Sequence, residues 1–214
     1  MTYTNVRAIK SEAGLVNPTV NVVEKKGQKF LLKDYSSCSG RDLFARYLAN
    51  RQHQILKTLQ GIEGIPREVR LINGSILVRE FVEGTFLKEG KPEALPDAFY
   101  HDLRSLVEEM HRRDVVHLDL RHMKNILVQE GGQPCLIDFE TAVDLNTLSL
   151  VPALQNLLKW VDRSALLRIK NRYFEHLLTE EDRQAIRQLY RWRRLWVFSP
   201  FELREKDRVS DVNP

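Results

Sequence analysis

Apolar and polar residues alternate along much of the chain up to Glu80, a pattern that predicts a β-rich segment. The pairs Lys26-Gly27 and Asn73-Gly74 each separate two such runs and predict hairpin turns, because glycine tolerates the positive φ of a tight turn. Between the hairpins, residues 39–60 predict a helix, since their apolar side chains recur at helical spacing. The predicted strands are Asn5–Ile9, Thr19–Lys25, Gln28–Lys33, Glu68–Ile72 and Ser75–Glu80.

After residue 84 the spacing of apolar positions changes from that of strands to that of helices. One apolar stripe predicts a helix that ends near Arg113, and helical spacing returns from Val151 onward. Between these helices the apolar runs 126–128 and 135–137 predict a short hairpin. We therefore expect a β-rich lobe over residues 1–82, a helical lobe over residues 83–214, and a ligand cleft between them. The stripe consists of Phe99, Leu103, Leu106, Val107 and Met110.

The composition is that of a folded globular protein and excludes a disordered chain. Of the 214 residues, 43% are hydrophobic and 29% charged, and the formal net charge of +4 suits a phosphate-bearing partner without requiring one. The N-terminus has no apolar signal core, and no apolar run approaches the roughly 18 residues needed to cross a bilayer. We expect a cytoplasmic protein in which Cys135 is a buried, reduced thiol. A peripheral contact with the inner face of a membrane is left open.

Two aspartates, Asp119 and Asp138, stand at the ends of apolar runs, and Asn125 lies between them. Buried carboxylates are costly unless they are paired or bound to a metal ion, and carboxylate and amide oxygens are ligands that suit Mg²⁺. The alternative is that both carboxylates cap helices or turns. The order H-x-D, then N, then two apolar residues and D-F matches the catalytic and metal-binding loops of kinases, which favours the catalytic interpretation.

With these motifs the chain resembles a small bacterial member of the protein-kinase-like superfamily, close to the RIO-type kinases and to the kinases of lipopolysaccharide-core sugars (Kdo or heptose). The resemblance extends from about Arg7 to Leu178 and is carried by HLDLRHMKNILV, by CLIDFE, and by LKTLQGIEGIP followed by LVREFVEG. It implies a two-lobed α+β fold with a shortened helical lobe. It also implies ATP and Mg²⁺ as cofactors and phosphoryl transfer to a hydroxyl, either of a protein serine or threonine or of a lipopolysaccharide-core sugar.

The resemblance assigns a role to each polar residue of this region. Asp119 would be the base that orients the acceptor hydroxyl, and Asn125 and Asp138 would hold the metal ions. Arg121 would face the transferred phosphate and stabilise its charge, although an ordinary surface arginine is the alternative. His117 would brace the loop rather than transfer a proton.

The β-rich lobe would supply the nucleotide-binding residues. Strand alternation places Lys33 on the same face as Leu31, from which the lysine would reach the phosphates. The connector from Glu80 to Val82 would offer backbone groups to an adenine edge. The phosphate loop KSEAGLVNPTV has one glycine, Gly14, so the backbone can approach a phosphate closely at one point.

The chain departs from the kinase pattern in two further ways. Gln52 stands where a glutamate would pair with Lys33, so either the amide holds the lysine or another acid, Glu63 or Asp42, does so. Asn125 follows Asp119 by six residues rather than the usual five, so the catalytic loop carries one extra residue, and His122 within it is interpreted as a structural or surface residue. These departures support an alternative function, that of a pseudokinase-like nucleotide-binding or regulatory module with little turnover.

The C-terminal segment RQAIRQLYRWRRLWVF predicts a helix with a basic face and an apolar face. Such a helix can lie on anionic lipid or pack its tryptophans against the protein, and we favour packing. Nucleic acid ranks last among the partners, because no motif indicates base recognition. The basic face would carry Arg183, Arg187, Arg191 and Arg194, and the apolar face Leu189, Trp192 and Trp196.

Overall fold

The computed structural model describes residues 4–10, 18–36, 42–87, 95–148 and 151–195, with the backbone alone at Lys10, Asp42 and 190–195. The chain forms two compact units, residues 1–162 and 163–214. The predicted lobe boundary at residue 82 falls inside the first unit, between strands β5 and β6, and stays a prediction. Among the described residues, no helix is both long enough and apolar enough to span a membrane.

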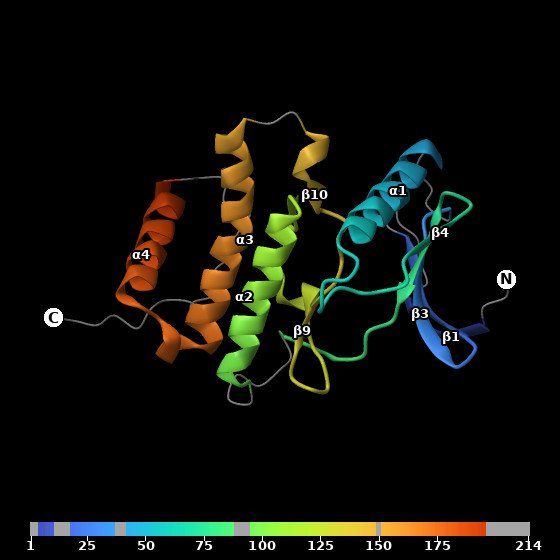
Figure 1. Ribbon diagram of the computed structural model, residues 1–214, viewed down its shortest axis with the longest axis horizontal. Coiled ribbons are helices and arrows are strands. Elements are labelled where there is room, and N and C mark those ends of the chain that lie inside the picture. The colour runs from blue at the N-terminus through green and yellow to red at the C-terminus, as the bar shows by residue number, and fades with distance from the viewer. Residues whose placement is uncertain (1–3, 11–17, 37–41, 88–94, 149–150, 196–214) are drawn as a thin grey trace. The chain divides into compact units, whose positions relative to one another are not determined.

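The first unit begins with a five-stranded antiparallel sheet in the order β1-β2-β3-β5-β4 (Figure 1). Its two hairpins turn at Lys26-Gly27 and Asn73-Gly74, where all four residues have a positive φ, as predicted. Helix α1 (Asp42–Thr58) packs on β4 and β5. The strands are β1 (Thr4–Lys10), β2 (Thr19–Lys25), β3 (Gln28–Asp34), β4 (Arg70–Ile72) and β5 (Ile76–Glu80).

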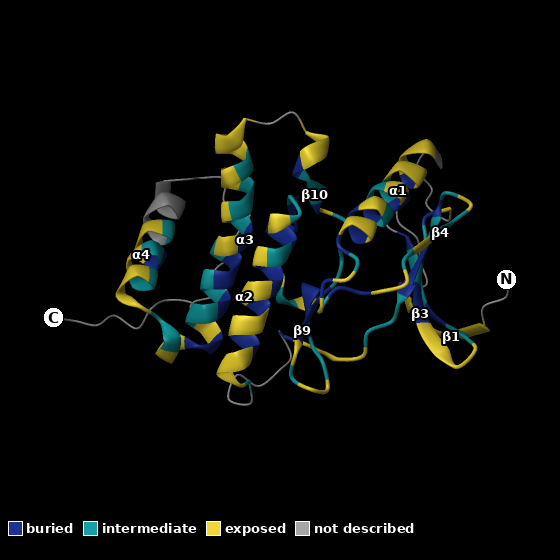
Figure 2. Ribbon diagram, viewed as in Figure 1, coloured by how far each residue is buried: buried dark blue, intermediate teal, exposed yellow. Residues whose placement is uncertain are grey.

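The rest of the first unit is built around α2 (Asp97–Arg112), whose predicted apolar stripe is entirely buried. Figure 2 shows this helix with one buried and one exposed side, as its amphipathic sequence requires. The predicted hairpin is strands β8 (Ile126–Val128) and β9 (Pro134–Leu136), joined by β6 (Thr85–Phe86) into a three-stranded sheet. β7 (Val115–Val116) pairs with β10 (Val143–Asp144), and the 3₁₀ turns are η2 (Met123–Asn125) and η3 (Leu145–Thr147).

Helix α3 (Pro152–Tyr173) begins in the first unit and continues into the second. The second unit also contains η4 (Glu175–Leu177) and α4 (Glu180–Leu195). The start of α4 is capped: Thr179 Oγ1 accepts a hydrogen bond from the backbone N–H of Asp182 (3.1 Å). On the predicted basic face Arg187 is exposed and pairs with Glu180, whereas the side chains at 191–194 and Trp196 lie outside the description.

Candidate active site

Lys33 on β3 is the buried centre of a charge cluster whose two carboxylates are partly exposed. Its side chain is 8% exposed, and its Nζ lies 2.9 Å from Asp138 Oδ1 and 2.7 Å from Glu140 Oε1. A buried ammonium group is tolerated only where opposite charges and hydrogen bonds compensate its desolvation, and here two carboxylates do so. The cluster joins the five-stranded sheet to the loop that follows β9.

Gln52 on α1 does not contact Lys33; it acts through Tyr35. The Tyr35 hydroxyl lies 3.1 Å from Gln52 Oε1 and 3.1 Å from Glu140 Oε1, so it links the helix to the carboxylate. The acid that pairs with Lys33 is therefore Glu140 rather than Glu63, which lies elsewhere, and the side chain of Asp42 is outside the description. The sequence pattern missed Glu140 because it occupies the position where protein kinases carry a glycine.

Asp119 lies inside a ring of donors. Asn125 Nδ2 donates to Asp119 Oδ2 (2.9 Å), while His122 Nδ1 (2.5 Å) and Arg121 Nε (3.3 Å) lie against Asp119 Oδ1. The extra residue of the loop is accommodated by the 3₁₀ turn η2, in which the backbone N–H of Asn125 donates to the His122 carbonyl. The turn brings Asn125 back to Asp119 despite the longer spacing, and His122 contacts the carboxylate instead of being only a surface residue.

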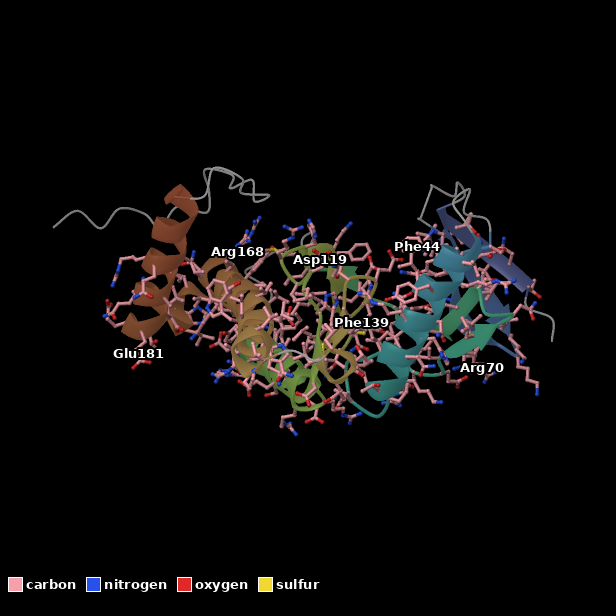
Figure 3. All side chains as sticks on the ribbon, turned by 90° about the horizontal axis from the view of Figure 1, so that it is seen from above. Phe44, Arg70, Asp119, Phe139, Arg168 and Glu181 are labelled. Atoms are coloured by element: carbon pink, nitrogen blue, oxygen red, sulfur yellow. The ribbon has the colours of Figure 1, made fainter. Side chains whose placement is uncertain are left out.

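Asp138 has a φ of 64°, and the next residue, Phe139, is buried against His117 with ring centroids 4.8 Å apart. His117 Nε2 lies 3.1 Å from the Ile137 carbonyl, and burial lowers the pKa of this imidazole. His117 therefore braces the loop as a neutral donor, in line with the sequence prediction. Figure 3 shows Phe139 deeper among the side chains than Asp119, in agreement with exposed fractions of 1% for Phe139 and 18% for the Asp119 side chain.

The charge of Lys33 keeps Asp138 ionised. Burial of Asp138 acts to raise its pKa, but the charge and hydrogen bond of Lys33 outweigh this, and the pKa is lowered overall. An ionised carboxylate is the form that binds a divalent cation.

Asp162 on α3 holds the backbone of the loop that leads to Asp119. The sequence did not predict this role. Its carboxylate is fully buried and accepts hydrogen bonds from the backbone N–H groups of His117 and Leu118, both at 2.8 Å. His111 Nε2 on α2 lies 3.0 Å from the same carboxylate. The sequence around Asp162 reads KWVDRS, and an aspartate between ordinary helix residues does not reveal its partner.

A family model described as the RIO domain matches residues 8–161, which is more than half of the chain. The chain belongs to the RIO-domain family. A solved structure of similar fold is the Rio2 kinase–ADP/Mg²⁺–phosphoaspartate complex from Chaetomium thermophilum, with a TM-score of 0.60, 19% sequence identity, and coverage of 83% of this chain and 58% of that chain. This likeness confirms the predicted two-lobed, protein-kinase-like α+β fold.

A curated relative of this RIO domain is the EKC/KEOPS complex subunit BUD32 of Encephalitozoon cuniculi. The two are 42% identical over 92 residues, which make up 42% of this chain and 44% of the relative. The chain thus spans less than two thirds of the length of either protein to which it is compared. The kinship shown is with the RIO domain, and the likeness to lipopolysaccharide-core kinases stays a prediction.

Asn125 and Asp138, the predicted metal ligands, each have a side-chain oxygen that could bind a cation. Asn125 and Asp138 each use one polar atom within the site, Nδ2 and Oδ1 respectively, which leaves Asn125 Oδ1 and Asp138 Oδ2 for a cation. In the described part of the chain, no three His, Cys, Asp or Glu side chains are grouped to hold a metal ion. This donor set fits Mg²⁺, which typically takes one or two protein ligands and completes its shell with phosphate oxygens and water.

The connector after β5 has fewer free backbone groups than the sequence suggested. The N–H of Glu80 donates to the Arg67 carbonyl (2.9 Å), and the N–H of Phe81 donates to the Lys29 carbonyl (3.1 Å). The Glu80 carbonyl accepts from Arg79 Nη1 (3.0 Å). Within the described residues the backbone of Val82 therefore remains for a base edge, and Gly14 lies outside the description.

A cavity of about 270 Å³ adjoins this connector, lined by residues that include Glu80, Val82 and Cys135. Neither Lys33 nor Asp138 lines it, so it is distinct from the charge cluster. Burial raises the pKa of the Cys135 thiol to about 12, which makes it an inert thiol as predicted.

Proposed function

We propose that this chain is a Mg²⁺-dependent kinase that transfers the γ-phosphoryl group of ATP to the hydroxyl of a protein serine or threonine. The observation that carries the proposal is that two groups of residues lie in the same unit: Lys33 paired with Asp138, and Asp119 bonded to Asn125. A buried cation, a base and two cation ligands are the parts that phosphoryl transfer requires.

Lys33 would bind phosphate oxygens. Two of its three donors bind carboxylates, so the ammonium group is positioned before a nucleotide arrives. Bound at Asn125 Oδ1 and Asp138 Oδ2, Mg²⁺ would neutralise charge on the phosphates. The ionised state of Asp138, maintained by Lys33, prepares that position.

Asp119 would orient the acceptor hydroxyl and take its proton. Asn125 holds Asp119 Oδ2, and the backbone of the loop is fixed in turn by Asp162. Arg121 lies beside Asp119 Oδ1, and its positive charge would stabilise the phosphoryl group in the transition state. The roles of Asp119 and Arg121 follow from this arrangement and from the kinase pattern.

The relatives support this choice of donor and metal. The Rio2 kinase structure is a complex with ADP and Mg²⁺ that contains a phosphoaspartate. Membership of the same domain family favours protein as the acceptor over a lipopolysaccharide-core sugar. Contact with the inner face of a membrane stays a prediction.

The test is transfer of label from γ-labelled ATP in the presence of Mg²⁺, with cell lysate and with membrane glycolipid as separate acceptors. We expect label on protein that is lost in Asp119→Asn and kept in Asp114→Asn, a matched change at a carboxylate that pairs with Lys159 instead. Label on glycolipid that requires Asp119 would make the chain a sugar kinase.

A nucleotide-binding module with little turnover is the second candidate. It is favoured by the engagement of both Asp119 oxygens, one by Asn125 and the other by His122 and Arg121. If it is correct, Mg²⁺-dependent ATP binding will survive Asp119→Asn, and no acceptor will be labelled by either protein.

A further inference from the structure

Arg79, near the end of β5, is a charged side chain inside the nucleotide-binding part of the fold. The residue is 7% exposed. Burial lowers the pKa of its guanidinium, against the opposing influence of Cys135, Asp138 and Glu80. An apolar residue would cost nothing at such a position, whereas a buried cation must be compensated by acceptors.

The strand register shows which way Arg79 faces. β3 and β5 are antiparallel, with Leu31 opposite Arg79 and Lys33 opposite Leu77. Residues directly opposite on antiparallel strands share a face, as do residues two apart on one strand. Arg79 therefore lies on the same face as Lys33, which binds Asp138. This is the face on which a nucleotide held by Lys33 must lie.

One donor of Arg79 is used within the described residues: Nη1 donates to the carbonyl of Glu80 at 3.0 Å. That carbonyl is the first backbone acceptor of the connector, where the amino group of an adenine would donate. It is already occupied by a donor. A guanidinium has five N–H groups in a planar fork, so others remain to meet an acceptor on a base.

Deepening the proposed function, on which this rests, we infer that Arg79 selects the base of the nucleotide by donating a hydrogen bond to an acceptor at position 6 of a purine. Guanine and hypoxanthine carry a carbonyl oxygen there, and arginine is well matched to it. Adenine carries an amino group, which would place donor against donor and leave the N–H of Arg79 that faces the base unpaired. GTP and ITP therefore bind more tightly than ATP.

The experiment is titration of the full chain with ATP, GTP and ITP in the presence of Mg²⁺. We expect GTP and ITP to bind about tenfold or more tightly than ATP, because a hydrogen bond to a charged donor is gained in place of a donor–donor contact. ITP lacks the 2-amino group of GTP, so equal binding of the two assigns the preference to position 6. Tighter binding of ATP than of both would overturn the inference.

The matched variants are Arg79→Met and Arg70→Met. Arg70 is exposed on the neighbouring strand β4, where it pairs with Glu68, so its loss should leave the GTP-to-ATP ratio unchanged. Arg79→Met should bring the ratio to one or below, and an unchanged ratio in a folded variant would also overturn the inference. If Arg79→Met does not fold, the ratio of GTP affinity to ATP affinity in the wild-type protein tests the inference by itself. If none of the three nucleotides binds with Mg²⁺, it is the proposed function that fails.

Discussion

Glu140 Oε1 lies 2.7 Å from Lys33 Nζ, closer than the 2.9 Å that separates this ammonium group from Asp138 Oδ1. The acid that positions the lysine thus comes from the loop that also carries the predicted metal ligand. Gln52 of helix α1 contributes indirectly, through Tyr35, which follows β3 and whose hydroxyl lies 3.1 Å from both Gln52 Oε1 and Glu140 Oε1. Among the described side chains, both acids that pair with Lys33 therefore come from the segment 138–140.

Glu140→Gln should lower the rate of phosphoryl transfer by about tenfold to a hundredfold, because a misplaced Lys33 no longer aligns the phosphates. The amide keeps the shape of the side chain but removes its charge. The measurement is the transfer rate at saturating ATP, beside Glu130→Gln, a change at an exposed residue of the β8–β9 turn. Equal rates in wild type and Glu140→Gln would show that the pair has no catalytic role.

Asp162→Asn should destabilise the protein by about 3 kcal/mol, because an amide cannot accept from both backbone N–H groups and leaves a buried donor unpaired. The free energy of unfolding in urea measures this. Asp114→Asn is the control: Asp114 is about two-fifths exposed and pairs with Lys159, so its loss should cost under about 1 kcal/mol. Similar losses in the two variants would mean that the Asp162 contacts do not support the loop.

Local sequence patterns predicted the helices and strands, but they did not predict the contacts between residues that are far apart in the sequence. The hairpins were predictable because Lys26-Gly27 and Asn73-Gly74 encode their turns directly. Asp119, Asn125 and Asp138 stood out because their order along the chain, within H-x-D, then N, then D-F, is characteristic of kinases. The Lys33–Glu140 pair joins residues 107 positions apart, and nothing near either residue in the sequence indicates the other.

The hydrogen bonds from Asp162 to the catalytic loop could not be predicted for a similar reason. Asp162 bonds backbone N–H groups 44 and 45 residues away, and a backbone donor has no sequence signature. His122 was interpreted as a structural or surface residue because the histidines show no metal-ligand clustering in the sequence, yet the structure places it against Asp119. Tertiary packing, rather than local propensity, decides both contacts.

Gly64→Ala and Gly61→Ala should differ sharply in stability although both residues have nearly the same backbone conformation, with φ of 84° and 85°. At Gly61 a Cβ atom meets nothing within 4 Å, so the cost is the left-handed strain alone, about 1 kcal/mol. At Gly64 it would lie 2.7 Å from Leu106 and 2.8 Å from the Pro134 carbonyl, which adds roughly 1–3 kcal/mol.

The measurement is the free energy of unfolding of the two glycine variants in urea. Because both substitutions cause similar backbone strain, the difference between their stabilities reports the steric contact at Gly64. The Gly64 carbonyl also accepts from the Leu136 N–H at 2.8 Å, so displacement of this turn would disturb β9 and the loop beyond it. We expect lower phosphoryl transfer in Gly64→Ala than in Gly61→Ala. Equal stabilities would show that the Leu106 side chain and the turn relax without cost.

Asp182→Asn should destabilise α4 by an amount that depends on pH. The carboxylate accepts from the backbone N–H of Thr179 (3.0 Å) and pairs with Lys170 (2.6 Å). Partial burial acts to raise its pKa, but the hydrogen bonds from Lys170 and Thr179 outweigh this and lower the pKa overall. A carboxyl whose pKa is lower in the folded state stabilises the fold fully above its unfolded pKa, near 3.9, and loses this as pH falls through the folded pKa.

The urea midpoint of Asp182→Asn should therefore lie below that of wild type at pH 7, and the gap should narrow as the pH approaches 3. Thr179→Ala removes the hydroxyl that caps the N–H of Asp182, a loss of about 1 kcal/mol at pH 7. A hydroxyl does not titrate in this range, so the Thr179→Ala deficit should change less with pH. A gap for Asp182→Asn that is the same at pH 7 and pH 3 would mean that the ionised carboxylate contributes nothing to the start of α4.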